Sequence, residues 1–234
     1  MFVMARGKIT PNNILHFNRK SGMDEEDADV RDITVDNIVD VASSDNVSDA
    51  MKNLLGRSGL LRGVKAVNPV CKVAGFVRTV ETSSYDWGTG IKGIYACSEG
   101  EILVIKCSNN DYAIWGGLAS CSAQVHGVGA TVIIGSSRDT EDILSMGYPV
   151  FSQDIKSCAG LPSNEGVIGE NLIVDDMVIS DGDFAVCDVD GVVIVPREHL
   201  DEVIDEVNNI KNFESSCFKK ITEDNQRLDD LVGF

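Results

Sequence analysis

The sequence predicts a mixed α/β fold with more than one β-sheet. In the middle of the chain, short apolar segments of strand length alternate with segments of helical periodicity. Between residues 172 and 196, strand-like segments follow one another with Asp-Gly pairs between them, a pattern typical of tight hairpins. Strands that first alternate with helices and then follow in a run indicate a mixed α/β architecture.

The composition excludes several classes of protein. A length of 234 residues suits one domain with extensions, and 43% hydrophobic with 24% charged residues is typical of a globular core. Asp and Glu outnumber Lys and Arg by 37 to 20, and the formal charge of −17 disfavours nucleic acid, whose phosphates need basic side chains. No apolar run reaches the roughly 18 residues of a membrane span, and the first residues become polar too soon for a signal peptide. We therefore expect a cytoplasmic protein without a nucleic-acid or membrane partner.

The cysteines and histidines do not form a metal motif. The seven cysteines are widely scattered, so we expect buried or bystander thiols, because Cys behaves as a small hydrophobe. The three histidines include no pair at ligand spacing, which argues against a zinc hydrolase. His126 precedes Gly127 at the expected end of a helix, where a C-terminal cap is the simplest interpretation.

The first half of the chain begins with an extension and then becomes helical. Residues 1–29 end in an acidic run, which we expect to be a solvated connector. From Thr34 onward one apolar stripe surrounds Ile38 and a second runs from Val47 to Leu55. The pattern then indicates strands over 63–67 and 70–80, a short helix over 87–97, and over 101–106 a strand buried on both faces.

The second half predicts further strands and a terminal helix. A short strand is expected over 149–151, followed by a loop to residue 170. Strands over 172–179, 184–188 and 192–196 are expected, with hairpin turns at Asp181-Gly182 and Asp190-Gly191. The acidic pairs in this region alternate with glycine as turn-forming residues do. Beyond Pro196, apolar residues recur at helical spacing.

Between Ala113 and Pro149 lies the stretch where we expect a site. Gly116-Gly117 precedes a helix, where the pair either makes a tight turn or exposes N–H groups that suit a carboxylate or phosphate. A strand over 131–134 ends in a Gly135-Ser136-Ser137 turn, which is followed by Arg138 and Asp139. Both places would expose polar groups at the ends of buried elements.

Arg138 and Asp139 allow two interpretations. Asp139 suits the N-cap of a helix over residues 140–146 that ends at Gly147, with Arg138 as a surface cation. Alternatively, the Asp139 carboxylate holds a hard divalent cation, and the planar guanidinium of Arg138 binds an anionic oxygen.

Taken together, four blocks resemble the RraA-like family, which includes 4-hydroxy-4-methyl-2-oxoglutarate aldolases, oxaloacetate decarboxylases and the regulator of ribonuclease activity. The blocks are Asp45-Asn-Val-Ser-Asp-Ala-Met51, Ala113-Ile-Trp-Gly-Gly-Leu-Ala119, Gly135-Ser-Ser-Arg-Asp139 and Asp188-Val-Asp-Gly-Val-Val-Ile-Val-Pro-Arg-Glu198. The resemblance covers roughly residues 41–198. It implies a swivelling β/β/α three-layer domain with mixed sheets, N-terminal helices and a C-terminal helix, assembled as a homotrimer or hexamer. It divides the chain into an extension (1–29), an RraA-like core (30–198), and a C-terminal helix and tail (199–234).

The resemblance also implies a reaction and residue roles. The amides of Gly116, Gly117, Leu118 and Ala119 would hold the carboxylate of a 2-oxo acid. Arg138 would be the catalytic contact to its carbonyl or enolate oxygen, and Asp139 would bind Mg²⁺ or Mn²⁺ partly through water. The implied activity is that of a metal-dependent lyase, which cleaves or decarboxylates a 2-oxo dicarboxylate of the 4-hydroxy-4-methyl-2-oxoglutarate or oxaloacetate type to give pyruvate.

One position departs from the family pattern. Gly117 stands where the family's aldolases carry Asp or Glu, which helps to orient a proton-transferring water. The motif therefore assigns no acid–base residue. The alternative is a non-catalytic regulatory or scaffold trimer that binds a protein partner or a small anion. Ribonuclease regulators of the family generally lack the carboxylate that this chain keeps as Asp139, which favours a metal site.

Overall fold

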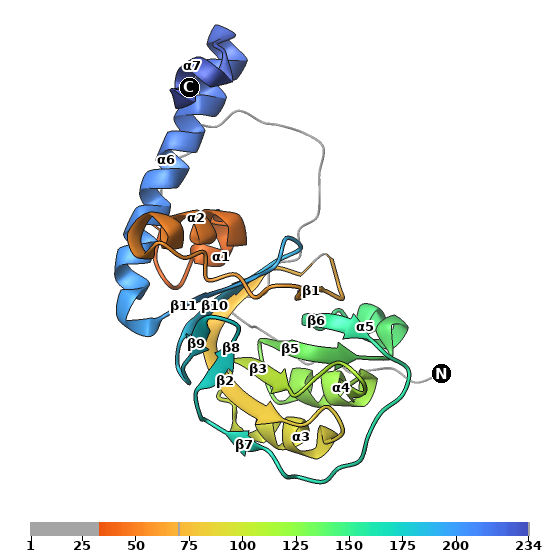
Figure 1. The fold of residues 1–234 in the computed structure, drawn as a ribbon. Helices are drawn as coiled ribbons and strands as arrows, with labels where there is room; N and C mark the ends of the chain where they lie inside the picture. Colours follow the sequence, from red (N-terminus) through yellow and green to blue (C-terminus); the bar gives the residue numbers. More distant parts are fainter. Residues whose placement is uncertain (1–32, 70, 234) are drawn as a thin grey trace.

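The computed structural model describes residues 33–69 and 71–233 (Figure 1), so the predicted extension over 1–29, its acidic run and His16 lie outside the described residues. The helices are α1 Ile38–Val41, α2 Ser44–Leu55, α3 Trp87–Ala96, α4 Gly117–Val125, α5 Thr140–Met146, α6 Leu200–Asp224 and α7 Leu228–Val232, with a 3₁₀ turn over Arg197–His199. The strands are β1 Lys65–Ala66, β2 Val73–Thr82, β3 Ile102–Cys107, β4 Ala113–Trp115, β5 Ala130–Ser137, β6 Val150–Ile155, β7 Val167–Ile168, β8 Leu172–Val174, β9 Met177–Ile179, β10 Phe184–Cys187 and β11 Val192–Val195.

Nine strands form one mixed sheet that curls until its edges nearly meet. Its main order is β1-β6-β5-β3-β2-β10-β11, with β4 added to β5 and β7 added to β2. The strands β2, β3, β5 and β6 are parallel, whereas β10 and β11 are antiparallel to their neighbours. The chain just before β1 bridges the two edges, because Leu61 N donates to Val192 O of β11 and β1 pairs with β6.

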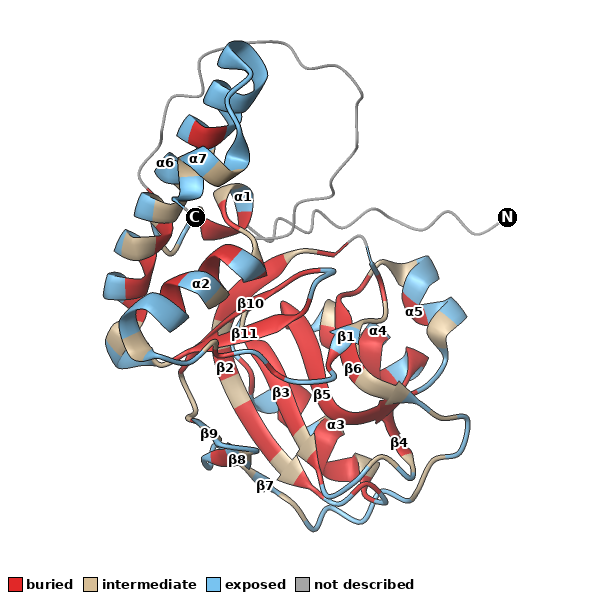
Figure 2. Cartoon of the chain, turned by 45° about the horizontal axis from the view of Figure 1, so that its top comes forward, coloured by how far each residue is buried: buried red, intermediate tan, exposed pale blue. Residues whose placement is uncertain are grey.

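Three hydrophobic clusters fill the layers of this fold. The terminal helices α1, α2 and α6 cover one part of the sheet, with Met51 and Val203 fully buried there. The inside of the curled sheet forms the second cluster, and α3, α4 and α5 pack on β3 and β5 to form the third. Figure 2 shows the central strands of the sheet mostly buried, β7, β8 and β9 partly exposed, and the far half of α6 mostly exposed. The mixed α/β class with helices at both ends is confirmed.

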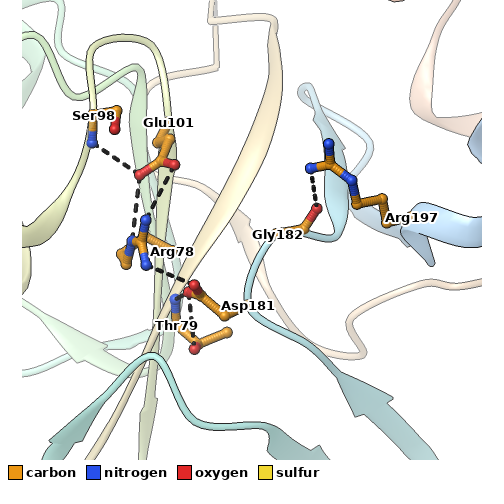
Figure 3. A network of polar contacts seen from close by, with 7 residues as sticks. All are labelled: Arg78, Thr79, Ser98, Glu101, Asp181, Gly182 and Arg197. Atoms are coloured by element: carbon orange, nitrogen blue, oxygen red, sulfur yellow. Dashed lines mark hydrogen bonds and ion pairs between the residues drawn. The ribbon is translucent and has the colours of Figure 1, made fainter.

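A polar network joins distant parts of the sheet (Figure 3). The guanidinium of Arg78 lies 3.3 Å from each carboxylate oxygen of Glu101 and donates to Asp181 Oδ2 at 2.6 Å. Asp181 Oδ1 accepts from the backbone N–H of Thr79 at 2.9 Å. The predicted hairpin at Asp181-Gly182 is therefore wrong. Asp181 instead anchors the connection between β9, which pairs with β8, and β10, which pairs with β2 and β11.

Two other predictions of local structure are also wrong. The predicted strand over 172–179 is a hairpin of two three-residue strands, because Asp175 turns the chain with a φ of 52°. The Gly135-Ser136-Ser137 segment is not a turn but the buried end of β5. Its serines tolerate burial because Ser136 Oγ donates to Asn110 O at 2.8 Å and Ser137 Oγ donates to Ser152 Oγ at 3.1 Å.

Several predictions are confirmed. Asp190-Gly191 joins β10 to β11 as a hairpin, and Leu200–Asp224 forms the terminal helix α6, which projects beyond the sheet. Cys121 and Cys158 are exposed, the other five cysteines are buried, and all seven are free. Burial raises the pKa of the Cys97 thiol to about 12, as expected for a structural thiol. Across the described residues, no helix is long and apolar enough to cross a membrane.

Candidate active site

Two strand-to-helix corners of the sheet come together to form the candidate site. β4 ends at Trp115 and leads through Gly116 into α4, while β5 ends at Ser137 and leads through Arg138 and Asp139 into α5. The strands are parallel neighbours, and Arg138 N donates to Trp115 O at 2.9 Å. The carboxyl ends of parallel strands are the usual place for ligands in such sheets.

Asp139 occupies the predicted N-cap position of α5 but does not cap that helix with its side chain. Its backbone is left-handed, with φ 58° and ψ 43°, and its carboxylate accepts no hydrogen bond from α5. Instead, Asp139 Oδ2 accepts the N–H of Gly117, the first residue of α4, at 3.0 Å. The predicted helix over 140–146 and its end at Gly147 are confirmed, whereas the expected side-chain cap is absent. The Asp139 carboxylate therefore faces the neighbouring corner.

Gly116 leaves the space that this arrangement needs. A Cβ atom on Gly116 would lie 2.4 Å from Asp139 Oδ2 and 3.1 Å from Arg138 Cγ. The φ of Gly116 is −163°, an extended value that any residue adopts, so only the missing side chain matters. Arg138 Nε lies 3.7 Å from Asp139 Oδ2, and both side chains remain about 40% exposed.

The first turn of α4 offers fewer N–H groups to an anion than the four that the resemblance implies. We call the available N–H groups of this turn the anion cradle. Gly117 N–H is already bonded to Asp139, which leaves the N–H groups of Leu118 and Ala119, which lack an intrahelical acceptor. Ser120 braces the turn, since its Oγ donates to Gly116 O and accepts from Trp115 Nε1, both at 2.9 Å. The cradle is thus held rigidly by buried groups.

A pocket of about 200 Å³ opens beside these residues. Arg138 and Asp139 line it together with Gly116, Leu118 and Ala119, while the remaining walls are apolar. This volume is smaller than the roughly 300–1,000 Å³ of drug-sized sites and suits a small organic acid. The pocket therefore brings together every predicted site residue except Gly117, which does not line it.

A buried carboxylate that the sequence analysis missed fixes one wall of the pocket. Asp86 is only 1% exposed and accepts hydrogen bonds from Thr89 Oγ1 at 2.6 Å, Asn164 N at 2.9 Å and Glu165 N at 3.0 Å. Burial alone would raise the pKa of Asp86, but these hydrogen bonds outweigh it and hold the pKa well below its usual value. Asp86 ties the 160–166 segment to the start of α3. In the sequence, the only indication of a structural role for Asp86 was its position just before a predicted helix.

Asp142 is a second carboxylate near the site, which the sequence analysis did not include among the candidate site residues. It lies in the first turn of α5, and its Oδ2 would be 3.0 Å from a Cβ atom on Gly117. Its spacing of three residues from Asp139, on one helix face, was the signal that could have found it. The space that an acidic side chain at Gly117 would enter is thus bordered by the carboxylate of Asp142.

The side chains that could bind a metal ion in this pocket fit a hard cation such as Mg²⁺ rather than zinc. Within the part of the chain that the structure describes, no group of three or more His, Cys, Asp or Glu side chains converges. Mg²⁺ is commonly bound through one or two carboxylates while it keeps several waters, whereas zinc sites need three or four protein ligands. Asp139, with one oxygen bonded to Gly117, retains a second oxygen for such an ion.

The histidines lie apart from this chemistry. His126 is the C-cap residue of α4, as predicted, and its ring packs against Tyr95 at 5.3 Å. His199 Nδ1 lies 3.1 Å from Glu202 Oε2 at the start of α6.

These features define an α/β protein that presents a carboxylate, a guanidinium and a helix N-terminus at one corner of a small pocket. The RraA-like family model, described as Aldolase/RraA, matches residues 44–194, and the chain belongs to this family. The resemblance inferred from the four sequence blocks is confirmed.

Relatives of the chain include an uncharacterised protein and a protein named as a putative aldolase. An uncharacterised protein of Methanocaldococcus jannaschii is 37% identical over 176 residues, which cover 74% of this chain and 84% of that protein. The Halalkalibacterium halodurans protein named "Putative 4-hydroxy-4-methyl-2-oxoglutarate aldolase" is 28% identical over 159 residues, which cover 68% of this chain and 74% of that protein.

Solved structures share the fold. An uncharacterised protein from Pseudomonas syringae has a TM-score of 0.74 at 25% identity, covering 85% of this chain and 96% of that chain. RraAS2 of Streptomyces coelicolor, described as an unusual member of the RNase ES inhibitor RraA protein family, has a TM-score of 0.70 at 20% identity, covering 80% of this chain and 97% of that one. The three-layer architecture that the resemblance implied is therefore the fold of this chain.

Proposed function

We propose that this chain is a divalent-metal-dependent carbon–carbon lyase that releases pyruvate from a 2-oxo acid. The substrates that the family resemblance suggests are 2-oxo dicarboxylates of the 4-hydroxy-4-methyl-2-oxoglutarate or oxaloacetate type. The observation that carries the proposal is the position of Asp139, whose carboxylate lies beside Arg138 in the pocket instead of capping its own helix.

Different residues of the pocket would contact different groups of a 2-oxo acid. The free N–H groups of Leu118 and Ala119, at the positive end of α4, suit the substrate carboxylate. Arg138, whose planar fork suits an anionic oxygen, contacts the 2-oxo group. Cleavage of the bond next to C3 leaves an enolate, and a cation on that oxygen stabilises charge that exists mainly in the transition state.

Asp139 would hold Mg²⁺ or Mn²⁺ next to the same oxygen. Such an ion, when bound, polarises the 2-oxo group as a Lewis acid. The bond between Gly117 N–H and Asp139 Oδ2 fixes the direction of the carboxylate, so the metal position and the anion cradle are set by one contact. This coupling is the reason that we assign both to a single active site.

Pyruvate release tests the proposal directly. The protein is incubated with oxaloacetate and with 4-hydroxy-2-oxo acids, with Mg²⁺ or with a chelator, and pyruvate is measured by a coupled assay. We expect turnover that chelator abolishes and that Asp139→Ala reduces by about 10²–10³-fold, the typical cost of removing one stabilising group. Absent turnover, or chelator-insensitive turnover unchanged in Asp139→Ala, would contradict the proposal.

We also propose that the chain assembles as a homotrimer or hexamer through the outer face of α4. Leu118 and Val125 on this face are 90% and 84% exposed, and Tyr95 of α3 beside it is 62% exposed. Cys121 completes the stripe at helical spacing and is exposed too. An apolar helix face of this kind, next to the pocket, is the kind of surface that subunit contacts cover.

A second candidate function is that of a non-catalytic regulatory or scaffold trimer. The observation that favours it is Gly117, which brings no carboxylate of its own to the pocket. In that case, small anions would bind at Arg138 without chemical change, and the apolar face of α4 would contact a protein partner. The pyruvate assay separates the two candidates, because only the lyase releases product.

A further inference from the structure

We propose that the far half of α6 is a docking face for the chain's own N-terminal extension, and that residues 14–17 of the extension occupy it. The far half comprises residues 214–224 of α6, and the docking face is the apolar side of these turns together with α7. Both lie at the end of the molecule away from the candidate pocket (Figure 1), so the inference is independent of the proposed lyase.

The apolar side of α6 that covers the core continues beyond the core. Ile204 and Val207 are buried in the hydrophobic cluster that α1, α2 and α6 form on the sheet. Phe218 and Ile221 repeat this pair 14 residues later. Fourteen residues make almost four turns of an α-helix, so the two pairs lie on the same side of the helix. The far half therefore carries an apolar face like the one that packs in the first half.

The helix α2 covers this side of α6 only as far as Glu214. Near the C-terminal end of α2, Asn53 Nδ2 donates to Glu206 Oε1 at 2.7 Å. In the first turn of α2, Asn46 Nδ2 donates to Glu214 Oε1 at 3.0 Å. The two helices are therefore antiparallel, and the contact with α2 stops where the far half of α6 begins.

The docking face is left with apolar side chains in contact with water. Phe218 is 68% exposed and Ile221 is 36% exposed, and Leu228 of α7, which packs against α6, is 57% exposed. Most of the stability of a helix in a protein comes from the packing of its apolar face, so turns without such packing are only marginally stable. Apolar side chains gathered on one exposed side of a helix therefore indicate a contact surface.

The N-terminal extension joins the described structure next to this face. Ile33, the first described residue, donates its N–H to Asn208 Oδ1 at 2.8 Å, and Asn208 Nδ2 donates to Ile33 O at 3.3 Å. From Asn208 to Ile221 the helix rises by about 20 Å, at roughly 1.5 Å per residue. The 16 residues from Phe17 to Ile33 can span about 50 Å. A segment tethered within this reach binds the face more readily than a separate molecule of equal affinity.

The composition of the extension matches the docking face. Residues 14–17 include three large apolar side chains, which are Ile14, Leu15 and Phe17. Residues 1–20 hold four basic side chains and no acidic one, whereas the exposed carboxylates of Asp224 and Asp230 lie at the end of α6 and on α7. An apolar cluster within a basic segment therefore suits this face through both hydrophobic contact and charge.

Amide hydrogen exchange of the full-length protein tests the contact. Leu15→Asp combined with Phe17→Asp removes two of the apolar side chains, and exchange of residues 214–224 should become at least about tenfold faster, because lost apolar burial makes local opening easier. Asn12→Asp combined with Asn13→Asp adds the same charge just before the cluster and should keep the original exchange rate. Equal rates over residues 214–224 in all three proteins would overturn the proposal.

A photo-cross-link identifies the occupant of the docking face. Benzoylphenylalanine replaces Phe17 in the full-length protein, and copies with light and heavy nitrogen are denatured and refolded together before illumination. We expect cross-links to residues 217–232 that join light to light and heavy to heavy, as mapped by mass spectrometry. Cross-links that join light to heavy copies would assign the face to a second copy of the chain. That result, or cross-links only to other parts of the molecule, would overturn the proposal.

Discussion

Replacing Gly116 by Ala tests whether the space beside Asp139 organises the site. The added Cβ would lie 2.4 Å from Asp139 Oδ2, whereas ordinary contacts begin at about 3.4 Å, so the carboxylate must move by about 1 Å. A displacement of that size can cost about 10²-fold in rate. The movement also weakens the Gly117–Asp139 hydrogen bond. Because Asp139 is 40% exposed, we expect only about 1 kcal/mol of lost stability, or roughly 2–4 °C in Tm.

Two other glycines provide matched controls for Gly116→Ala. A Cβ on Gly90, inside α3, would make ordinary contacts at 3.4 Å and beyond, so Gly90→Ala should keep activity and gain stability through helix propensity. At Gly117 the nearest atoms are Oδ2 and Cβ of Asp142, at 3.0 Å and 3.1 Å, so the exposed start of α5 needs to shift by only a few tenths of an ångström and Gly117→Ala should cost less than tenfold. Pyruvate release and thermal melting are measured for all three variants. Equal losses in Gly90→Ala and Gly116→Ala, or full activity in Gly116→Ala, would refute this reasoning.

Three further predictions concern other parts of the account. Asp86→Asn places an amide nitrogen against backbone donors and should lower the Tm by about 4–8 °C, for a loss of about 2 kcal/mol. Folding lowers the pKa of Asp86, so the difference in Tm between the original protein and Asp86→Asn should stay constant from pH 5 to 8 and shrink below pH 3.8, the ordinary pKa of Asp. Thermal melts across pH measure this difference, and a difference that grows in acid would contradict the role assigned to Asp86. Arg138→Lys keeps the positive charge but loses the planar guanidinium with its paired N–H donors, so kcat should fall by about 10²-fold with little change in Tm. An unchanged kcat would show that Arg138 does not take part in the reaction. Val125→Glu should dissociate the oligomer in light scattering, whereas Val178→Glu, on exposed β9, should not; a monomeric original protein would contradict the proposed assembly.

Local periodicity predicted the helices well because each is specified by its own apolar face. The stripes around Ile38 and from Val47 to Leu55 correspond to α1 and α2, and the spacing after Pro196 corresponds to α6. The β-rich region was harder. The sequence could not reveal that Asp181 bonds to Arg78, 103 residues away, and this contact turns an expected hairpin into a connection between sheets.

The candidate site shows the same division between local and distant information. Arg138, Asp139 and the glycine pair could be identified from the sequence, since they follow strands and resemble known blocks. The contacts of the Asp139 side chain could not be identified in this way. An N-cap pattern describes only the helix that follows Asp139, whereas its hydrogen-bond partner Gly117 lies 22 residues earlier in the chain. Asp86 was missed for the same reason, since its backbone partners Asn164 and Glu165 are almost 80 residues away.

Binding of Mn²⁺ tests the central claim most directly, because it examines Asp139 without depending on a substrate. The ion is titrated into the protein and followed by electron paramagnetic resonance, in the original chain, in Asp139→Asn and in Asp142→Asn. Asn tolerates the left-handed backbone of residue 139, so the fold should persist in the first variant. We expect one ion per chain in the original protein, added oxalate to change its spectrum, and binding to be lost in Asp139→Asn but kept in Asp142→Asn. Undiminished binding in Asp139→Asn would contradict the account.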